Sequence, residues 1–88
     1  MTQTTREAMR DFYATTDLDV TFHSAGCDDA EVKFGRLSYC ANEFDGGHLH
    51  TGYLDGYLIV NDSWAETSAE LIEAARAFFA EYGDLAAK

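Results

Sequence analysis

With 88 residues, 47% of them hydrophobic, the chain has enough apolar side chains for one core but not for two. Sixteen Asp and Glu against six Lys and Arg give a formal net charge of -10, so nucleic acid and anionic membranes are poor direct partners and a basic protein surface is favoured. The longest apolar run, Tyr57 to Val60, is far shorter than the about 20 residues of a membrane helix, and we expect a soluble single domain over residues 1–88.

The first predicted element is a short amphipathic helix over about Thr5 to Thr15. Thr4 and Glu7 have the spacing of a capping box. Apolar side chains then recur at helical spacing: Ala8, Met9, Phe12 and Tyr13. From Leu18 to His23 apolar and polar residues alternate, which predicts a strand with one buried face.

Two further strands are predicted in the middle of the chain. A loop over Ala25 to Asp29 precedes an apolar alternation at Val32 to Phe34. A second alternation, over Leu37 to Ala41, has the opposite phase, and we interpret the intervening Gly35-Arg36 as a bulge.

Turn residues then predict a pair of hairpins. Asp45-Gly46-Gly47 separates two extended runs, and Asp55-Gly56 is a second candidate turn before a final strand over Tyr57 to Val60. One long strand bent at its glycines is the alternative for this segment.

The last element is a helix with two possible starting points. Ser63 with Glu66 and Thr67 with Glu70 each satisfy a capping box, and the sequence leaves both open. Gly83 is positioned as the C-cap. An apolar stripe follows along the helix: Leu71, Ile72, Ala75, Phe78, Phe79 and Tyr82.

Taken in order, these elements predict a two-layer α+β fold. An N-terminal and a C-terminal helix flank an antiparallel sheet of three to four strands. The first six residues lack the apolar stretch of a secretion signal, so we expect a cytoplasmic protein whose Cys27 and Cys40 stay reduced. A disulfide between them remains the alternative if their segments pair.

Candidate chemistry is sparse. His48 and His50 lie on one face of a strand, but the sequence offers no clear third and fourth ligand, and we interpret them as exposed polar residues on a solvent-facing edge. Cys40 has no nucleophile motif around it. We therefore expect no metal, no cofactor and no catalytic activity.

The excess of acidic residues is the strongest indication of function in the sequence. Repulsion among so many negative charges destabilises the folded chain, so the excess needs a reason other than fold stability. Tyr53, Tyr57 and Trp64 are either core residues or apolar anchors beside the acidic residues. We predict partner contacts at the clustered, exposed carboxylates: Asp28, Asp29, Glu31, Asp45, Asp55, Glu66, Glu70 and Glu73.

Small size, a pI near 4.3, an α+β layout and no catalytic motif together resemble phage-encoded anti-defence proteins, the anti-CRISPR and anti-restriction inhibitors. The resemblance implies a nucleic-acid mimic that occupies the basic surface of a nucleic-acid-binding protein or complex, in the host cytoplasm if a phage encodes it. Two other hypotheses stay open. One is a structural or assembly subunit, including a homodimer, that uses an acidic face and an apolar patch. The other is a small metal- or thiol-dependent enzyme.

Overall fold

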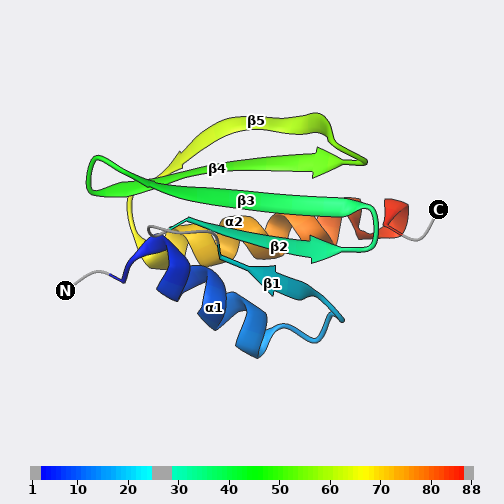
Figure 1. The fold of residues 1–88 in the computed structure, drawn as a ribbon, viewed down its shortest axis with the longest axis horizontal. Coiled ribbons are helices and arrows are strands. Elements are labelled where there is room, and N and C mark those ends of the chain that lie inside the picture. Colours follow the sequence, from blue (N-terminus) through cyan, green and yellow to red (C-terminus); the bar gives the residue numbers. More distant parts are fainter. Residues whose placement is uncertain (1–2, 25–28, 87–88) are drawn as a thin grey trace.

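The protein is a two-layer α+β fold in which two helices cover one face of a five-stranded antiparallel sheet (Figure 1). This computed structural model describes residues 3–24 and 29–86. The strands lie side by side in the order β1-β2-β3-β4-β5. The elements are α1 (Thr5–Thr15), β1 (Thr21–His23), β2 (Ala30–Phe34), β3 (Leu37–Phe44), β4 (Gly47–Leu54), β5 (Tyr57–Ala65), α2 (Ser68–Tyr82) and the 3-10 turn η1 (Gly83–Leu85). The predicted fold class is confirmed, with five strands in place of three or four.

Helix α1 begins where the capping box predicts. The Glu7 amide donates to the Thr4 hydroxyl at 3.1 Å, and the Thr4 amide donates to the Glu7 carboxylate at 2.9 Å. The buried face of the helix includes Phe12, whose ring stacks on Phe79 of α2 at a centroid distance of 5.6 Å. This contact holds the two helices together on the same side of the sheet.

Three two-residue turns build the meander. Asp45 and Gly46 have φ values of 49° and 82°, and Asp55 and Gly56 have 52° and 83°, the left-handed conformation that hairpin turns of this type require. The predicted bulge at Gly35-Arg36 is wrong, because these residues form the turn between β2 and β3. The chain reverses there, which is why the apolar alternation changes phase.

Strand β5 is longer than the sequence predicted. It continues past Val60 to Ala65 and pairs with β4 as a separate strand, so the alternative of one long bent strand is wrong. Ser63 lies inside this strand. Helix α2 therefore begins after Thr67, whose hydroxyl accepts from the Glu70 amide at 3.1 Å.

The first strand is shorter than predicted, because the chain turns before it. The Val20 amide donates to the Leu18 carbonyl at 2.9 Å, and only Thr21–His23 pair with β2. The predicted loop over Ala25 to Asp29 lies largely outside the described residues, since only Asp29 of that loop is described. This leaves β1 as a three-residue strand at one edge of the sheet.

The core lies between the sheet and the two helices. The Phe78 ring packs so closely on Gly52 that a Cβ there would lie 2.3 Å from the ring. At the far end Gly83 caps α2 in a right-handed conformation, and the chain continues into η1, after which the Ala86 carbonyl accepts from the Arg36 amide at 3.0 Å. In the described ranges, neither helix combines the length and apolar content needed to cross a membrane.

Candidate functional site

The face of the sheet opposite the helices is the candidate site, and we call it the open face (Figure 1). Cross-strand partners share a face, and those on the open face alternate with core pairs such as Tyr39 and Gly52. No described helix covers it. Four such pairs of β3 and β4 lie on it: Ser38 with Tyr53, Cys40 with Thr51, Asn42 with Leu49, and Phe44 with Gly47.

One end of the open face carries an exposed aromatic patch, formed by Phe44, Leu49 and Trp64. Phe44 and Trp64 are 56% and 49% exposed, and their rings meet edge to face at a centroid distance of 6.4 Å. A Cβ on Gly47 would lie 2.4 Å from the indole, so the Trp64 ring lies directly on the Gly47 backbone. The glycine thus fixes the position of a large apolar side chain that solvent reaches.

Carboxylates surround this patch and no positive charge lies near it in the sequence. Exposed Asp45 follows Phe44 in the β3–β4 turn, and exposed Asp62 and Glu66 lie two residues before and after Trp64. Residues 37–75, which supply β3, β4, β5 and half of α2, contain no lysine or arginine. The patch therefore lies in the part of the chain where negative charge is least neutralised.

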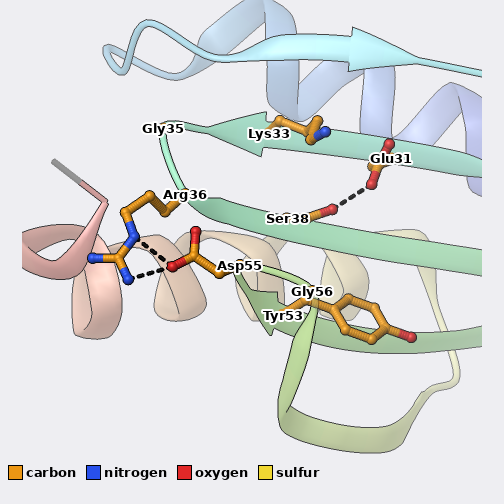
Figure 2. Close-up of a pocket in the computed structure, with 8 residues that line it drawn as sticks. All are labelled: Glu31, Lys33, Gly35, Arg36, Ser38, Tyr53, Asp55 and Gly56. Atoms are coloured by element: carbon orange, nitrogen blue, oxygen red, sulfur yellow. Dashed lines mark hydrogen bonds and ion pairs between the residues drawn. The ribbon is translucent and has the colours of Figure 1, made fainter. Parts of the chain in front are cut away.

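A shallow hollow of about 330 Å³ occupies the other end of the open face (Figure 2). Its wall carries Lys33 and the ion pair of Arg36 with Asp55, whose Nε to Oδ2 distance is 2.7 Å. Their hydrogen bond lowers the pKa of the Asp55 carboxyl and raises the pKa of the Arg36 guanidinium. Positive and negative groups alternate here, so this end lacks the unbalanced charge of the aromatic patch.

Cys40 lies between these two ends and does not have the surroundings of a catalytic thiol. Burial, with a further contribution from the Glu31 carboxylate, raises the pKa of its thiol. The Ser38 hydroxyl and the Cys40 thiol both donate to Glu31. A raised thiol pKa disfavours the thiolate that nucleophilic catalysis needs.

His48 and His50 occupy the core and not a solvent-facing edge, so this prediction is wrong. They are 2% and 7% exposed, because the Asp45-Gly46 turn pairs them with Glu43 and Ala41 on the helix-covered face. Their polarity is satisfied by hydroxyl groups: Thr5 bonds Nδ1 of His48 at 2.6 Å, and Tyr39 bonds Nδ1 of His50. Across residues 3–24 and 29–86, no three His, Cys, Asp or Glu side chains converge as metal ligands.

The predicted partner-binding carboxylates are not gathered in one place. Asp29 and Glu31 line a hollow of about 280 Å³ on the open face, while Asp45 and Asp55 lie in the turns at opposite ends of β4. Asp28 falls outside the described residues. The four of these carboxylates that the structure describes form no continuous row.

Three more of these carboxylates belong to α2 and its entry, where local structure uses two of them. Glu66 precedes the N-cap Thr67 and therefore lies outside the helix that carries Glu70 and Glu73. The Glu70 carboxylate accepts from the hydroxyl of the N-cap Thr67 at 3.4 Å, and the Glu73 carboxylate pairs with Arg76 at 3.1 Å. These roles explain part of the acidity without a partner.

The aromatic patch was the part of the site that sequence reasoning placed least well. The sequence leaves Trp64 and Tyr57 open between core and interface and gives no sign of Phe44, whereas all three side chains are exposed in the structure. The available signal was the Asp45-Gly46 turn, which puts Phe44 opposite Gly47 and Leu49 opposite Asn42. Comparisons with protein-family models, curated protein sequences and solved structures each return no match.

Proposed function

We propose that this protein is a binding protein that docks its open face onto a basic surface of a partner protein, with Trp64 as the central anchor. The observation that carries the proposal is the exposed pair of Phe44 and Trp64, fixed on Gly47 among carboxylates. Tryptophan is enriched among the residues that dominate interface energies. A fixed indole is ordered before binding and loses little conformational freedom on docking.

A basic partner fits this patch better than an apolar one does. An arginine guanidinium stacks on an indole face with about 0.5 to 2 kcal/mol of attraction. The same group donates hydrogen bonds to carboxylates such as Asp45, Asp62 and Glu66. The net charge of -10 also steers a positively charged surface toward the protein.

The partner class that we propose is a nucleic-acid-binding protein or complex. Surfaces rich in lysine and arginine are the ones that bind nucleic acid. A protein that occupies such a surface excludes the nucleic acid from it, which makes this chain an inhibitor. An imitation of the phosphate backbone would need a regular row of carboxylates. The scattered carboxylates of this protein instead support occlusion by one docked face.

An assembly subunit is the second candidate, and the aromatic patch itself favours it. An exposed apolar pair of this kind also suits a permanent subunit contact. The two candidates differ in salt dependence, because screening weakens a contact between opposite surface charges and leaves an apolar contact nearly unchanged. A homodimer through the open face brings two chains of formal charge -10 together. Salt screens the repulsion between them, so the homodimer contact strengthens at high salt, unlike a contact with a basic partner.

The test is affinity capture of partners from a lysate of the source cells at low salt and again at about 0.5 M salt, where the screening length is only several Å. We expect wild-type protein to capture a nucleic-acid-binding protein at low salt and to release it at high salt. The Trp64→Ala variant loses this capture.

Tyr13→Ala is the matched control, because Tyr13 is an aromatic residue on α1 that is also 45% exposed. It retains capture if the interface is the open face. Equal capture by wild type and Trp64→Ala contradicts the proposal. Capture that persists at high salt moves the assignment to the assembly subunit.

A further inference from the structure

A second feature, separate from the open face, is the free edge of the sheet at β5. This strand is nine residues long and pairs only with β4 among the described strands. It contains no lysine, arginine or proline, three of the residues that protect a sheet edge from pairing with another chain. It does carry the exposed Asp62, and its pairing with β4 shifts register on both sides of Val60. The opposite edge, β1, has only three residues. The long edge is therefore the one available to add a strand.

A groove runs beside this edge, between β5 and α2. It exists because α1 packs against the other side of α2 through Phe12 and Phe79, so the helix layer does not extend over β5. Val60 is the cross-strand partner of Gly52, which lies under Phe78, and so Val60 is on the groove side of its strand. The apolar wall is formed by Val60, Ala74, Ala77, Phe78 and Tyr82.

The size of the groove indicates what it holds. Its volume is about 210 Å³. Pockets that bind small molecules usually have volumes of about 300 Å³ or more. A space of this size takes one or two side chains. Because Ala74 and Ala77 are small, the helix leaves room for side chains from outside.

Charge along α2 indicates the chemistry of the occupant. Glu70, Ala74, Ala77 and Glu81 follow one another at spacings of four, three and four, so they form one stripe of the helix. The stripe has methyl groups in the middle and a carboxylate at each end. Glu81 itself lines the groove.

We propose that an extended segment of a partner protein binds at β5 as a sixth strand of the sheet. Its backbone pairs with the edge of β5, one apolar side chain enters the groove against Ala74 and Ala77, and a lysine or arginine meets Glu81. Strand addition of this kind draws its affinity from backbone hydrogen bonds and its selectivity from alternate side chains. The inference concerns a surface other than the aromatic patch and does not rest on the proposed function.

The test uses a nine-residue peptide that alternates arginine and valine, with blocked termini, titrated into isotope-labelled protein at low salt. Two-dimensional NMR is expected to show shifts of the amides of β5 and of Ala74 and Ala77. The β5 amides also become slower in hydrogen exchange. No binding at millimolar peptide overturns the proposal, as do shifts confined to β1 or to Phe44 and Leu49 of the aromatic patch.

Two matched pairs of variants locate the site. Ala77→Trp fills the groove and is expected to weaken peptide binding at least tenfold, whereas Ala69→Trp, at an exposed position in the first turn of α2, leaves it unchanged. Glu81→Lys changes an exposed side chain and weakens binding, with exposed Asp19→Lys as its control. Equal effects within either pair overturn the proposal.

The Phe44→Ala variant separates this inference from the proposed function, because Phe44 belongs to the aromatic patch but lies in β3 and not in β5. It is expected to keep the peptide site at β5 while weakening capture of the partner of the open face. Loss of peptide binding in Phe44→Ala, with no effect of Ala77→Trp, overturns the sixth strand. Self-association of the free protein through β5, seen as a dimer that Ala77→Trp disrupts, also overturns it in favour of a second copy as the occupant.

Discussion

At the scale of single residues, Trp64 reports on the candidate interface directly, because it is the only tryptophan in the chain. The Gly47→Ala variant places a Cβ 2.4 Å from the indole and forces the ring off its support. We expect the fluorescence of this variant to move toward that of free tryptophan and to be quenched more by acrylamide. Gly83→Ala is the control, since a Cβ there meets nothing within 4 Å. Unchanged emission from Gly47→Ala contradicts the described geometry.

Thr5 ties α1 to the sheet through a buried polar contact. Its amide and its hydroxyl each donate to Glu43 at 2.8 Å, and the hydroxyl also accepts from His48 at 2.6 Å. Thr5→Val removes the hydroxyl, so Glu43 and His48 each lose a hydrogen-bond partner. This change is expected to lower the free energy of unfolding by about 1 to 3 kcal/mol. Urea unfolding measures this change. Thr15→Val, at an exposed position, has a much smaller effect; equal losses refute the role of Thr5.

His50 makes stability depend on pH. Burial and then the nearby His48 lower the pKa of His50 below its ordinary value of 6.5. The unfolded chain therefore binds a proton at a higher pH than the folded one does, and stability falls as the pH is lowered from about 6.5 through the folded pKa. Glu43 acts in the same direction at lower pH, because the Thr5 hydrogen bonds outweigh burial and lower its pKa.

Urea midpoints of wild type and His50→Gln, measured from pH 8 to pH 5, check this linkage. We expect the wild-type midpoint to fall relative to that of the variant as the pH decreases. A difference between the two proteins that does not change with pH contradicts the linkage.

At the scale of elements, the structure shows which of two candidate capping residues, Ser63 or Thr67, begins α2. Thr67 accepts from the Glu70 amide, whereas Ser63 lies in β5 and its hydroxyl donates to the Asn61 carbonyl. Thr67→Ala is expected to destabilise the protein by about 1 kcal/mol, the usual cost of losing an N-cap. Ser63→Ala is expected to cost much less. The reverse order in thermal unfolding contradicts the described helix start.

Much of the fold was predictable because its signals are local. The capping box at Thr4 and the turns at Asp45-Gly46 and Asp55-Gly56 act over three or four residues, and each formed as expected. At Gly35-Arg36 the predicted bulge is wrong, because a bulge and a two-residue reversal both change the phase of an alternation. The sequence pattern alone does not separate them.

Burial of the histidines was harder to predict, because it depends on partners far away in the sequence. His48 is 43 residues from Thr5, and a buried imidazole is stable only once that hydroxyl satisfies it. The exposure of Phe44 and Trp64 likewise depends on which face the helices leave open. The sequence shows which elements carry the carboxylates. It does not show their local contacts, such as the ion pair of Asp55 with Arg36, because those depend on how the strands pair.

At the scale of the whole molecule, charge affects stability and binding in opposite directions. The formal charge of -10 makes the folded chain repel itself, and added salt screens that repulsion. We therefore expect the melting temperature to rise between about 10 mM and 0.5 M sodium chloride, over which the screening length shortens from about 30 Å to several Å. Differential scanning calorimetry measures it. A melting temperature that falls with salt shows that ion pairs dominate over repulsion.

Site-specific photo-crosslinking tests the central claim most directly. A photoreactive phenylalanine analogue replaces Phe44 in one variant and Tyr13 in another, both at exposed aromatic positions. Each variant is irradiated at low salt in a lysate of the source cells. A partner captured through the open face crosslinks at position 44 and not at position 13, and the crosslink disappears at about 0.5 M salt. Crosslinking at position 13 alone, or equally at both positions, contradicts docking through the open face.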